Sequence, residues 1–127
     1  METFLLDSSA ILNVLFGSPA GQKASKLVSS GLAATSIICY CEVLNKSNVQ
    51  RRKTAEDFLS TLVIFPVSFA DGKTAVEIQD ECRKEGGFVP STDCLIAATA
   101  TNHSATVLTS DKDFERIRQV KKIILTD

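Results

Sequence analysis

Phe4-Leu5-Leu6-Asp7-Ser8-Ser9 is the stretch of sequence that decides the fold. Three apolar residues are followed directly by an acid and two hydroxyl residues, and a short apolar run of this kind predicts a buried strand over residues 3–7. In an open α/β sheet, ligands bind outside the carboxyl ends of the strands, which is where Asp7 would lie. Asp7 is therefore a candidate site residue, although an isolated acid at this junction can equally be a helix N-cap.

Strands and helices alternate along the rest of the 127 residues, which predicts one domain over residues 1–127. This alternation favours an α/β fold with a parallel sheet covered by helices on both faces. Further strands are expected at 32–37, 63–67, 106–109 and 122–126, and Pro66 indicates that the strand at 63–67 lies at an edge. Helices are expected after the first strand and at 19–30, 37–48, 52–62, 72–85, 92–102 and 113–117.

Residues typical of helix ends support several of these boundaries. Ser8 or Ser9 is expected to cap the first helix, and Ser36 the helix at 37–48. Ser18 before Pro19 predicts the start of the helix at 19–30, and Gly31 predicts its end.

The composition excludes several classes of protein. The formal net charge is −1, there is no Trp and only one Tyr, so neither a strongly basic surface nor a broad aromatic platform for bases is expected. No basic leader or membrane-length apolar stretch is present, which favours a cytoplasmic protein with no membrane partner. The four cysteines then predict free thiols, and Cys39-Tyr40-Cys41 is a poor zinc motif.

Three further acids, Glu42, Asp93 and Asp111, are expected to converge on Asp7. Each aspartate could instead have a purely structural role. Asp93 can interact favourably with the dipole of its helix, and Asp111 can stabilise a turn. Glu42 is harder to explain in this way, because its neighbours are apolar and a buried carboxylate needs a partner. Oxygen ligands select hard cations such as Mg²⁺ or Mn²⁺, and such clusters serve phosphate chemistry.

Four segments in this order resemble the PIN-domain ribonucleases, and most of all the VapC toxins of prokaryotic toxin–antitoxin pairs. They are Leu5-Leu6-Asp7-Ser8-Ser9, Cys41-Glu42-Val43-Leu44, Ser91-Thr92-Asp93-Cys94-Leu95-Ile96-Ala97 and Leu108-Thr109-Ser110-Asp111-Lys112-Asp113-Phe114. The resemblance covers essentially the whole chain. It implies a five-stranded parallel sheet in the order 3-2-1-4-5, and Mg²⁺- or Mn²⁺-dependent hydrolysis of RNA. It also implies a homodimer held inactive by a VapB antitoxin.

By this resemblance, Asp7, Glu42, Asp93 and Asp111 take the family's acidic positions. Asp113 competes with Asp111 for the fourth position, and the number of metal ions stays open. Ser9 and Thr109 match positions where the family has a hydroxyl near the metal.

Other cations and other functions remain as alternatives. Arg51-Arg52-Lys53, expected in a turn, and Lys112, Arg116 and Lys121-Lys122 are candidate phosphate contacts or plain surface charges, with Lys112 the best placed. A PIN-like scaffold that binds RNA or a protein without cutting is the main alternative function. Receiver domains and haloacid-dehalogenase-type phosphatases fit poorly, because Ser8 and Ser9 stand where those families need a second acid.

Overall fold

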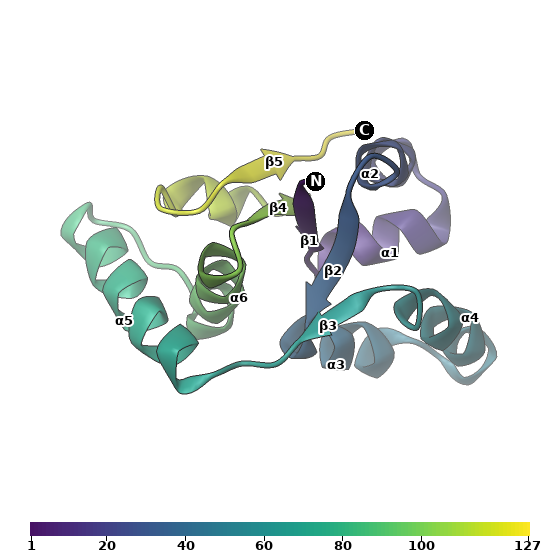
Figure 1. The fold of residues 1–127 in the computed structure, drawn as a ribbon, viewed down its shortest axis with the longest axis horizontal. Helices are drawn as coiled ribbons and strands as arrows, with labels where there is room; N and C mark the ends of the chain where they lie inside the picture. Colours follow the sequence, from purple (N-terminus) through teal and green to yellow (C-terminus); the bar gives the residue numbers. More distant parts are fainter.

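The computed structural model describes all residues from Met1 to Asp127, and its five strands form one parallel sheet in the order β3-β2-β1-β4-β5 (Figure 1). The strands span Thr3–Leu6 (β1), Leu32–Ser36 (β2), Val63–Phe65 (β3), Ala105–Thr109 (β4) and Lys122–Ile124 (β5). The expected α/β class, the strand order and the edge position of β3 are confirmed.

β1 is the central strand and sets the position of the site. Leu5 pairs with Ala34 of β2 on one side and with Val107 of β4 on the other. The backbone N–H of Asp7 continues the β1–β4 pairing by donating to the Leu108 carbonyl at 3.1 Å. β2 and then β3 lie on one side of β1, and β4 and then β5 lie on the other side. The carboxyl ends of β1 and β4 therefore flank the switch point at which open α/β sheets bind ligands.

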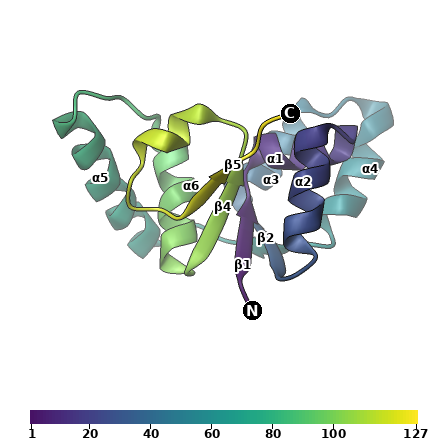
Figure 2. The same ribbon diagram turned by 90° about the horizontal axis from the view of Figure 1, so that it is seen from above.

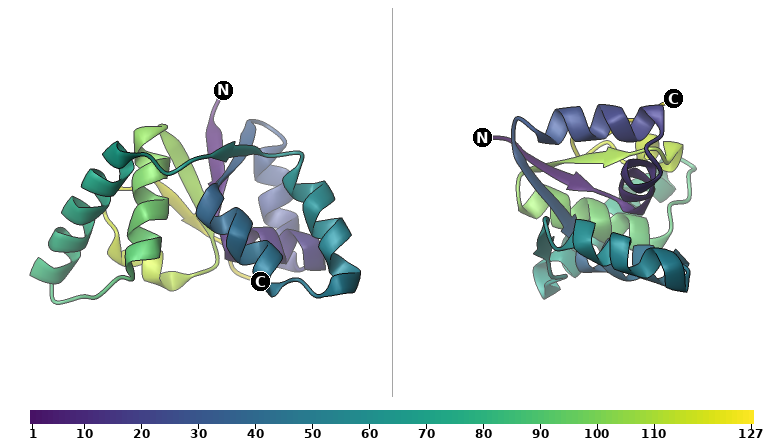
Figure 3. Two further views of the ribbon diagram at one scale, coloured as in Figure 1. Left: turned by 90° about the horizontal axis from the view of Figure 1, so that it is seen from below. Right: turned by 90° about the vertical axis from the view of Figure 1, so that its right-hand side faces the viewer.

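Six α-helices and one short 3-10 helix connect the strands. They span Ser8–Phe16 (α1), Pro19–Val28 (α2), Ile37–Lys46 (α3), Val49–Leu59 (α4), Phe69–Lys84 (α5), Ser91–Asn102 (α6) and Lys112–Arg116 (η1). α5 packs on α6 at one side of the molecule, and α1 packs with α2 and α3 at the other (Figure 2). The right-hand view of Figure 3 shows α2 on one face of the sheet and α6 on the opposite face.

The helix N-termini explain how the chain leaves each strand. Ser18 caps α2, with Pro19 at the first helical position, and Ser36 caps α3, as expected. The expectation that Ser8 or Ser9 caps α1 is wrong: Asp7 is the N-cap, and its side chain accepts from the Ala10 N–H at 2.9 Å. Asp7 has the extended backbone that an N-cap needs, whereas Ser8 is already the first helical residue.

Several expected boundaries are wrong by a few residues. α2 ends at Val28 with Ser29 as its C-cap, so Gly31 does not end it. A Cβ at Gly31 would lie 2.3 Å from the Glu2 carbonyl oxygen, and this close approach is why glycine is needed there. α4 begins at Val49, because Asn48 caps it through the Arg51 N–H. Arg51-Arg52-Lys53 therefore lie in the helix and not in a turn.

Large apolar side chains from β1, β4 and the helices form the core. Leu5, Leu6, Ile11 and Leu108 are at most 1% exposed, so the central strands are covered on both faces. Ala55, Leu59 and Leu62, from α4 and the turn after it, are also buried in this core. All four cysteines are free thiols, as expected, although Cys41 is exposed. No helix combines the length and apolar character that crossing a membrane requires.

Candidate metal centre

Asp7 is buried at the end of β1, with 5% of its surface exposed. Its Oδ1 accepts from the Ala10 N–H at 2.9 Å and from the Ser9 hydroxyl at 2.7 Å, and its Oδ2 accepts from the Thr109 hydroxyl. Burial raises the pKa of the Asp7 carboxyl, the three hydrogen bonds offset part of this rise, and the charge of Asp111 adds to it. Asp7 is thus both a helix cap and a member of an acidic group, so its two interpretations do not exclude each other.

Glu42 reaches the same place from the second turn of α3. Its Oε1 accepts from the Ser8 hydroxyl at 2.6 Å, which ties α3 to the start of α1. The expectation, taken from its apolar neighbours, that Glu42 is a buried carboxylate holds only in part. Only Cys39 and Val43 of α3 are buried, because α3 covers the sheet with one face. Glu42 is half-buried, and one side of its carboxylate faces the site.

Asp93, Asp111 and Asp113 come from the first turn of α6 and from the segment after β4. One carboxylate oxygen from each lies within 4.8 Å of the others. Asp111 is also the N-cap of η1 and accepts from the Asp113 N–H at 2.9 Å. Asp93 and Asp111 are half-buried, whereas Asp113 is exposed. Both acids of the last motif therefore lie near Asp93, and Asp111 lies deeper.

These side chains line one small pocket of about 130 Å³ at the carboxyl ends of β1 and β4. Its lining contains the four acids and two serines named from the sequence, together with a lysine and an isoleucine: Asp7, Ser8, Ser9, Glu42, Lys46, Asp93, Ile96 and Asp111. The structure thus brings together residues that are up to 104 positions apart in the sequence. Asp113 is outside this lining, and Thr109 lies behind Asp7 as its hydrogen-bond donor.

The charges of the acids act on one another most clearly at Asp93. Burial, followed by the charges of Asp111, Asp7, Glu42 and Asp113, raises the pKa of the Asp93 carboxyl to about 6. The five acids therefore form one electrostatic cluster. A bound cation would relieve both their repulsion and the cost of their burial.

The donor atoms at this site fit a hard divalent cation. Every side-chain donor in the pocket is a carboxylate or hydroxyl oxygen, apart from the amine of Lys46. The only histidine, His103, instead stacks on Phe65 with ring centroids 3.8 Å apart. Oxygen ligands of this kind match the preferences of Mg²⁺ and Mn²⁺ and do not match those of zinc.

Lys46 is the site residue that the sequence analysis missed. It lies one turn after Glu42 on α3, and this spacing of four residues was the signal that could have identified it. Lys112, which the sequence favoured as the phosphate contact, is exposed on η1 and does not line the acidic pocket.

Solved structures of toxin–antitoxin complexes share this fold over nearly the whole chain. A chain of VapBC2 from Rickettsia felis, crystallised with a fragment of promoter DNA, is similar with a TM-score of 0.83 and 22% identity, covering 98% of this chain and 99% of that one. A chain of DNA-bound VapBC from Salmonella typhimurium is similar with a TM-score of 0.80 and 24% identity, and the match covers 98% of each chain. A chain of VapBC-5 from Mycobacterium tuberculosis is similar with a TM-score of 0.70 and 20% identity, and the match covers 98% of this chain and 100% of that one.

The family model for the PIN domain matches residues 4–120. The chain therefore belongs to the PIN domain family, a family of nucleases, and the resemblance seen in its four acidic motifs is confirmed. No curated protein matches the sequence closely.

Proposed function

We propose that residues 1–127 form a single PIN-like domain that hydrolyses RNA with the help of Mg²⁺ or Mn²⁺, and that it acts as the toxin of a VapBC-type pair. The observation that carries this proposal is the pocket in which Asp7, Glu42, Asp93 and Asp111 meet at the switch point of the sheet. Membership of the PIN domain family supports the nuclease activity. Partial burial of Asp93 and the charges of the neighbouring acids raise its pKa, and this supports the need for a divalent cation.

The acids have two kinds of role in this proposal. Asp7, Asp93 and Asp111 would hold the metal, and Asp113, which is exposed outside the lining of the acidic pocket, is the alternative to Asp111. A divalent cation held there would supply a Lewis acid for a water molecule and for the phosphate. Ser9 and Thr109 orient Asp7, because both hydroxyls donate to its carboxylate. Glu42 faces the pocket with one oxygen held by Ser8, and it orients or deprotonates the attacking water.

The proposed partners are an RNA substrate, a second copy of the chain and a VapB-like antitoxin. The antitoxin is supported by the similar structures, which are described as VapBC or FitAB complexes. The prediction of a homodimer rests on the family resemblance.

An RNA cleavage assay tests the activity directly. The purified protein is incubated with a mixture of single-stranded and structured RNA, with Mg²⁺ or Mn²⁺ and then with EDTA. Asp7→Asn, which keeps the size of the side chain, excludes a contaminating nuclease, and Asp80→Asn on the exposed face of α5 is the matched control. We expect cleavage that requires the metal, disappears in Asp7→Asn and persists in Asp80→Asn.

Two results would contradict this proposal in different ways. Cleavage that persists in EDTA would remove the role of the metal. RNA that binds the wild-type protein with the metal present but stays intact would support a binding scaffold instead of a nuclease.

A further inference from the structure

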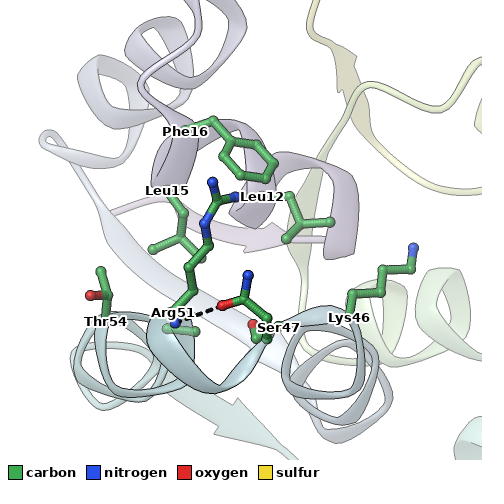
Figure 4. A pocket seen from close by; sticks show the side chains of 9 residues that line it. Leu12, Leu15, Phe16, Lys46, Ser47, Arg51 and Thr54 are labelled. Atoms are coloured by element: carbon green, nitrogen blue, oxygen red, sulfur yellow. Dashed lines mark hydrogen bonds between the residues drawn. The ribbon is translucent and has the colours of Figure 1, made fainter.

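A second pocket lies directly beside the acidic pocket. It has a volume of about 350 Å³, within the range of small-molecule sites, and it lies between α1, the end of α3 and the start of α4 (Figure 4). We call it the side pocket. Its apolar floor includes Leu12 and Leu15, and its polar rim includes Lys46, Asn48 and Arg51.

The side pocket has the opposite charge to the acidic pocket. Its lining contains two cations, Lys46 and Arg51, and no carboxylate. Neither cation belongs to any of the four ion pairs in the structure, so both charges remain available to a ligand. Two cations without a carboxylate in the same lining favour an anionic ligand.

An exposed aromatic ring provides a second recognition feature. Phe16, at the end of α1, is 62% exposed, although a large apolar side chain is normally covered. Arg51 extends from α4 toward this ring, with its guanidinium carbon 5.3 Å from the ring centroid (Figure 4). An aromatic ring beside a guanidinium group is the kind of surface on which single-stranded bases stack.

Lys46 connects the two pockets, because it lines both of them. A single extended ligand that fills the side pocket therefore also reaches the acids. The phosphate backbone of a nucleic acid strand meets this requirement, since it carries one charge at every nucleotide while its bases remain free to stack.

We propose that the side pocket binds one nucleotide of single-stranded RNA next to the cleaved bond. The base stacks against Phe16 and Arg51, and Lys46 binds the phosphate that leads toward the acids. This inference rests on the proposed ribonuclease function and adds the subsite that positions the strand.

Binding of a short, fluorescein-labelled single-stranded RNA in EDTA tests the subsite without cleavage. The chain offers two matched pairs of variants for this measurement by fluorescence anisotropy. Phe16→Ala is compared with Phe88→Ala, because the two rings are 62% and 63% exposed. Arg51→Met is compared with Arg52→Met, because the two arginines are neighbours on α4 and only Arg51 lines the pocket.

We expect Phe16→Ala and Arg51→Met each to raise the Kd by about ten-fold, as is typical of the loss of one stacked base. Phe88→Ala and Arg52→Met should change it by less than about two-fold, the scale of ordinary surface substitutions. The same RNA carrying 4-thiouridine should crosslink under ultraviolet light to peptides that contain Phe16 or Arg51, as mapped by mass spectrometry.

The possible failures are distinguishable. If the wild-type protein cuts RNA but Phe16→Ala and Arg51→Met bind it normally, the subsite is wrong and the nuclease stands. If these two variants instead lose only a protein partner, the side pocket is a protein-docking site and our proposal is overturned. If the wild-type protein neither binds nor cuts RNA, the proposed function itself fails.

Discussion

The Thr109 hydroxyl at the end of β4 donates a hydrogen bond to Oδ2 of Asp7 at the end of β1. The same hydroxyl oxygen accepts from the backbone N–H of Asp111 at 2.9 Å. Thr109 is fully buried, so water cannot replace either bond. One hydroxyl therefore fixes the positions of two acids at the switch point of the sheet.

Thr109→Val should destabilise the protein by about 1–3 kcal/mol, because a buried carboxylate loses a donor while the shape of the side chain is kept. Urea unfolding in EDTA measures this change. Thr101→Val is the control, since Thr101 is an exposed residue whose hydroxyl donates only to the Ala97 carbonyl of its own helix. Equal unfolding midpoints for the two variants would show that the two hydrogen bonds of the Thr109 hydroxyl contribute nothing.

Asp93→Asn should raise the stability of the metal-free protein at neutral pH. The pKa of Asp93 is raised to about 6 in the folded state, above its ordinary value of 3.8, so between these values the folded protein binds more protons than the unfolded chain. The stability that depends on this group is therefore fully present below about pH 4 and is lost as the pH rises through 6. At pH 7 the gain from Asp93→Asn should be about 1 kcal/mol, less than the full shift because the group is partly solvated.

Thermal unfolding in EDTA at pH 4.5 and at pH 7.5 tests this prediction. The difference between Asp93→Asn and the wild type should be larger at the higher pH. Asp80→Asn, at an exposed position on α5, should show no such dependence. If Asp93→Asn is less stable than the wild type at both pH values, Asp93 acts mainly as a first-turn residue that stabilises α6.

The sequence was sufficient to identify the two central strands, because β1 and β4 are short segments rich in apolar residues with an acid one or two positions after each. The convergence of Asp7 and Asp111 follows from the position of these strands side by side. The strand order itself came from the family resemblance, since periodicity alone does not determine which strands are neighbours. Glu42 lines the acidic pocket, as the sequence led us to expect, although its helix is covered on one face only.

Contacts between distant segments could not be read from the sequence. The side pocket requires the end of α1 and the start of α4 to lie face to face, which no local pattern indicates. Arg51 therefore appeared to be one of several surface charges. Lys46 could have been found from its spacing to Glu42. That it lines two pockets could not have been predicted from the sequence.

Binding of Mn²⁺ should distinguish the two acids of the last motif. Asp111→Asn should reduce Mn²⁺ affinity strongly, by about ten-fold or more, because Asp111 lines the acidic pocket. Asp113→Asn should reduce it by only about two- to three-fold, because Asp113 is exposed outside this lining. Asn at position 111 can still accept from the Asp113 N–H, so η1 is kept. Calorimetric titration measures both affinities, and the reverse order would assign the fourth acidic position to Asp113.

Asp71 is a buried acid with a structural role that the sequence analysis did not identify. It is 2% exposed and forms a capping box with Ser68 at the start of α5. Its carboxylate also accepts from the Thr99 hydroxyl at 3.3 Å and from the Asn102 amide at 2.8 Å, which joins α5 to α6. Burial alone would raise the pKa of Asp71, but these hydrogen bonds outweigh it and hold the pKa below its ordinary value.

Asp71→Ala should therefore cost about 2 kcal/mol of stability at neutral pH, through the lost cap and the donors left without a partner. Because the pKa of Asp71 is lowered in the folded state, its contribution is present above the ordinary value of 3.8 and is lost as the pH falls below it. The difference in unfolding free energy between wild type and Asp71→Ala should thus narrow between pH 5 and pH 2.5. Asp57→Ala, at an exposed site on α4, is the control, and a gap that stays constant over this range would show that the Asp71 charge does not matter.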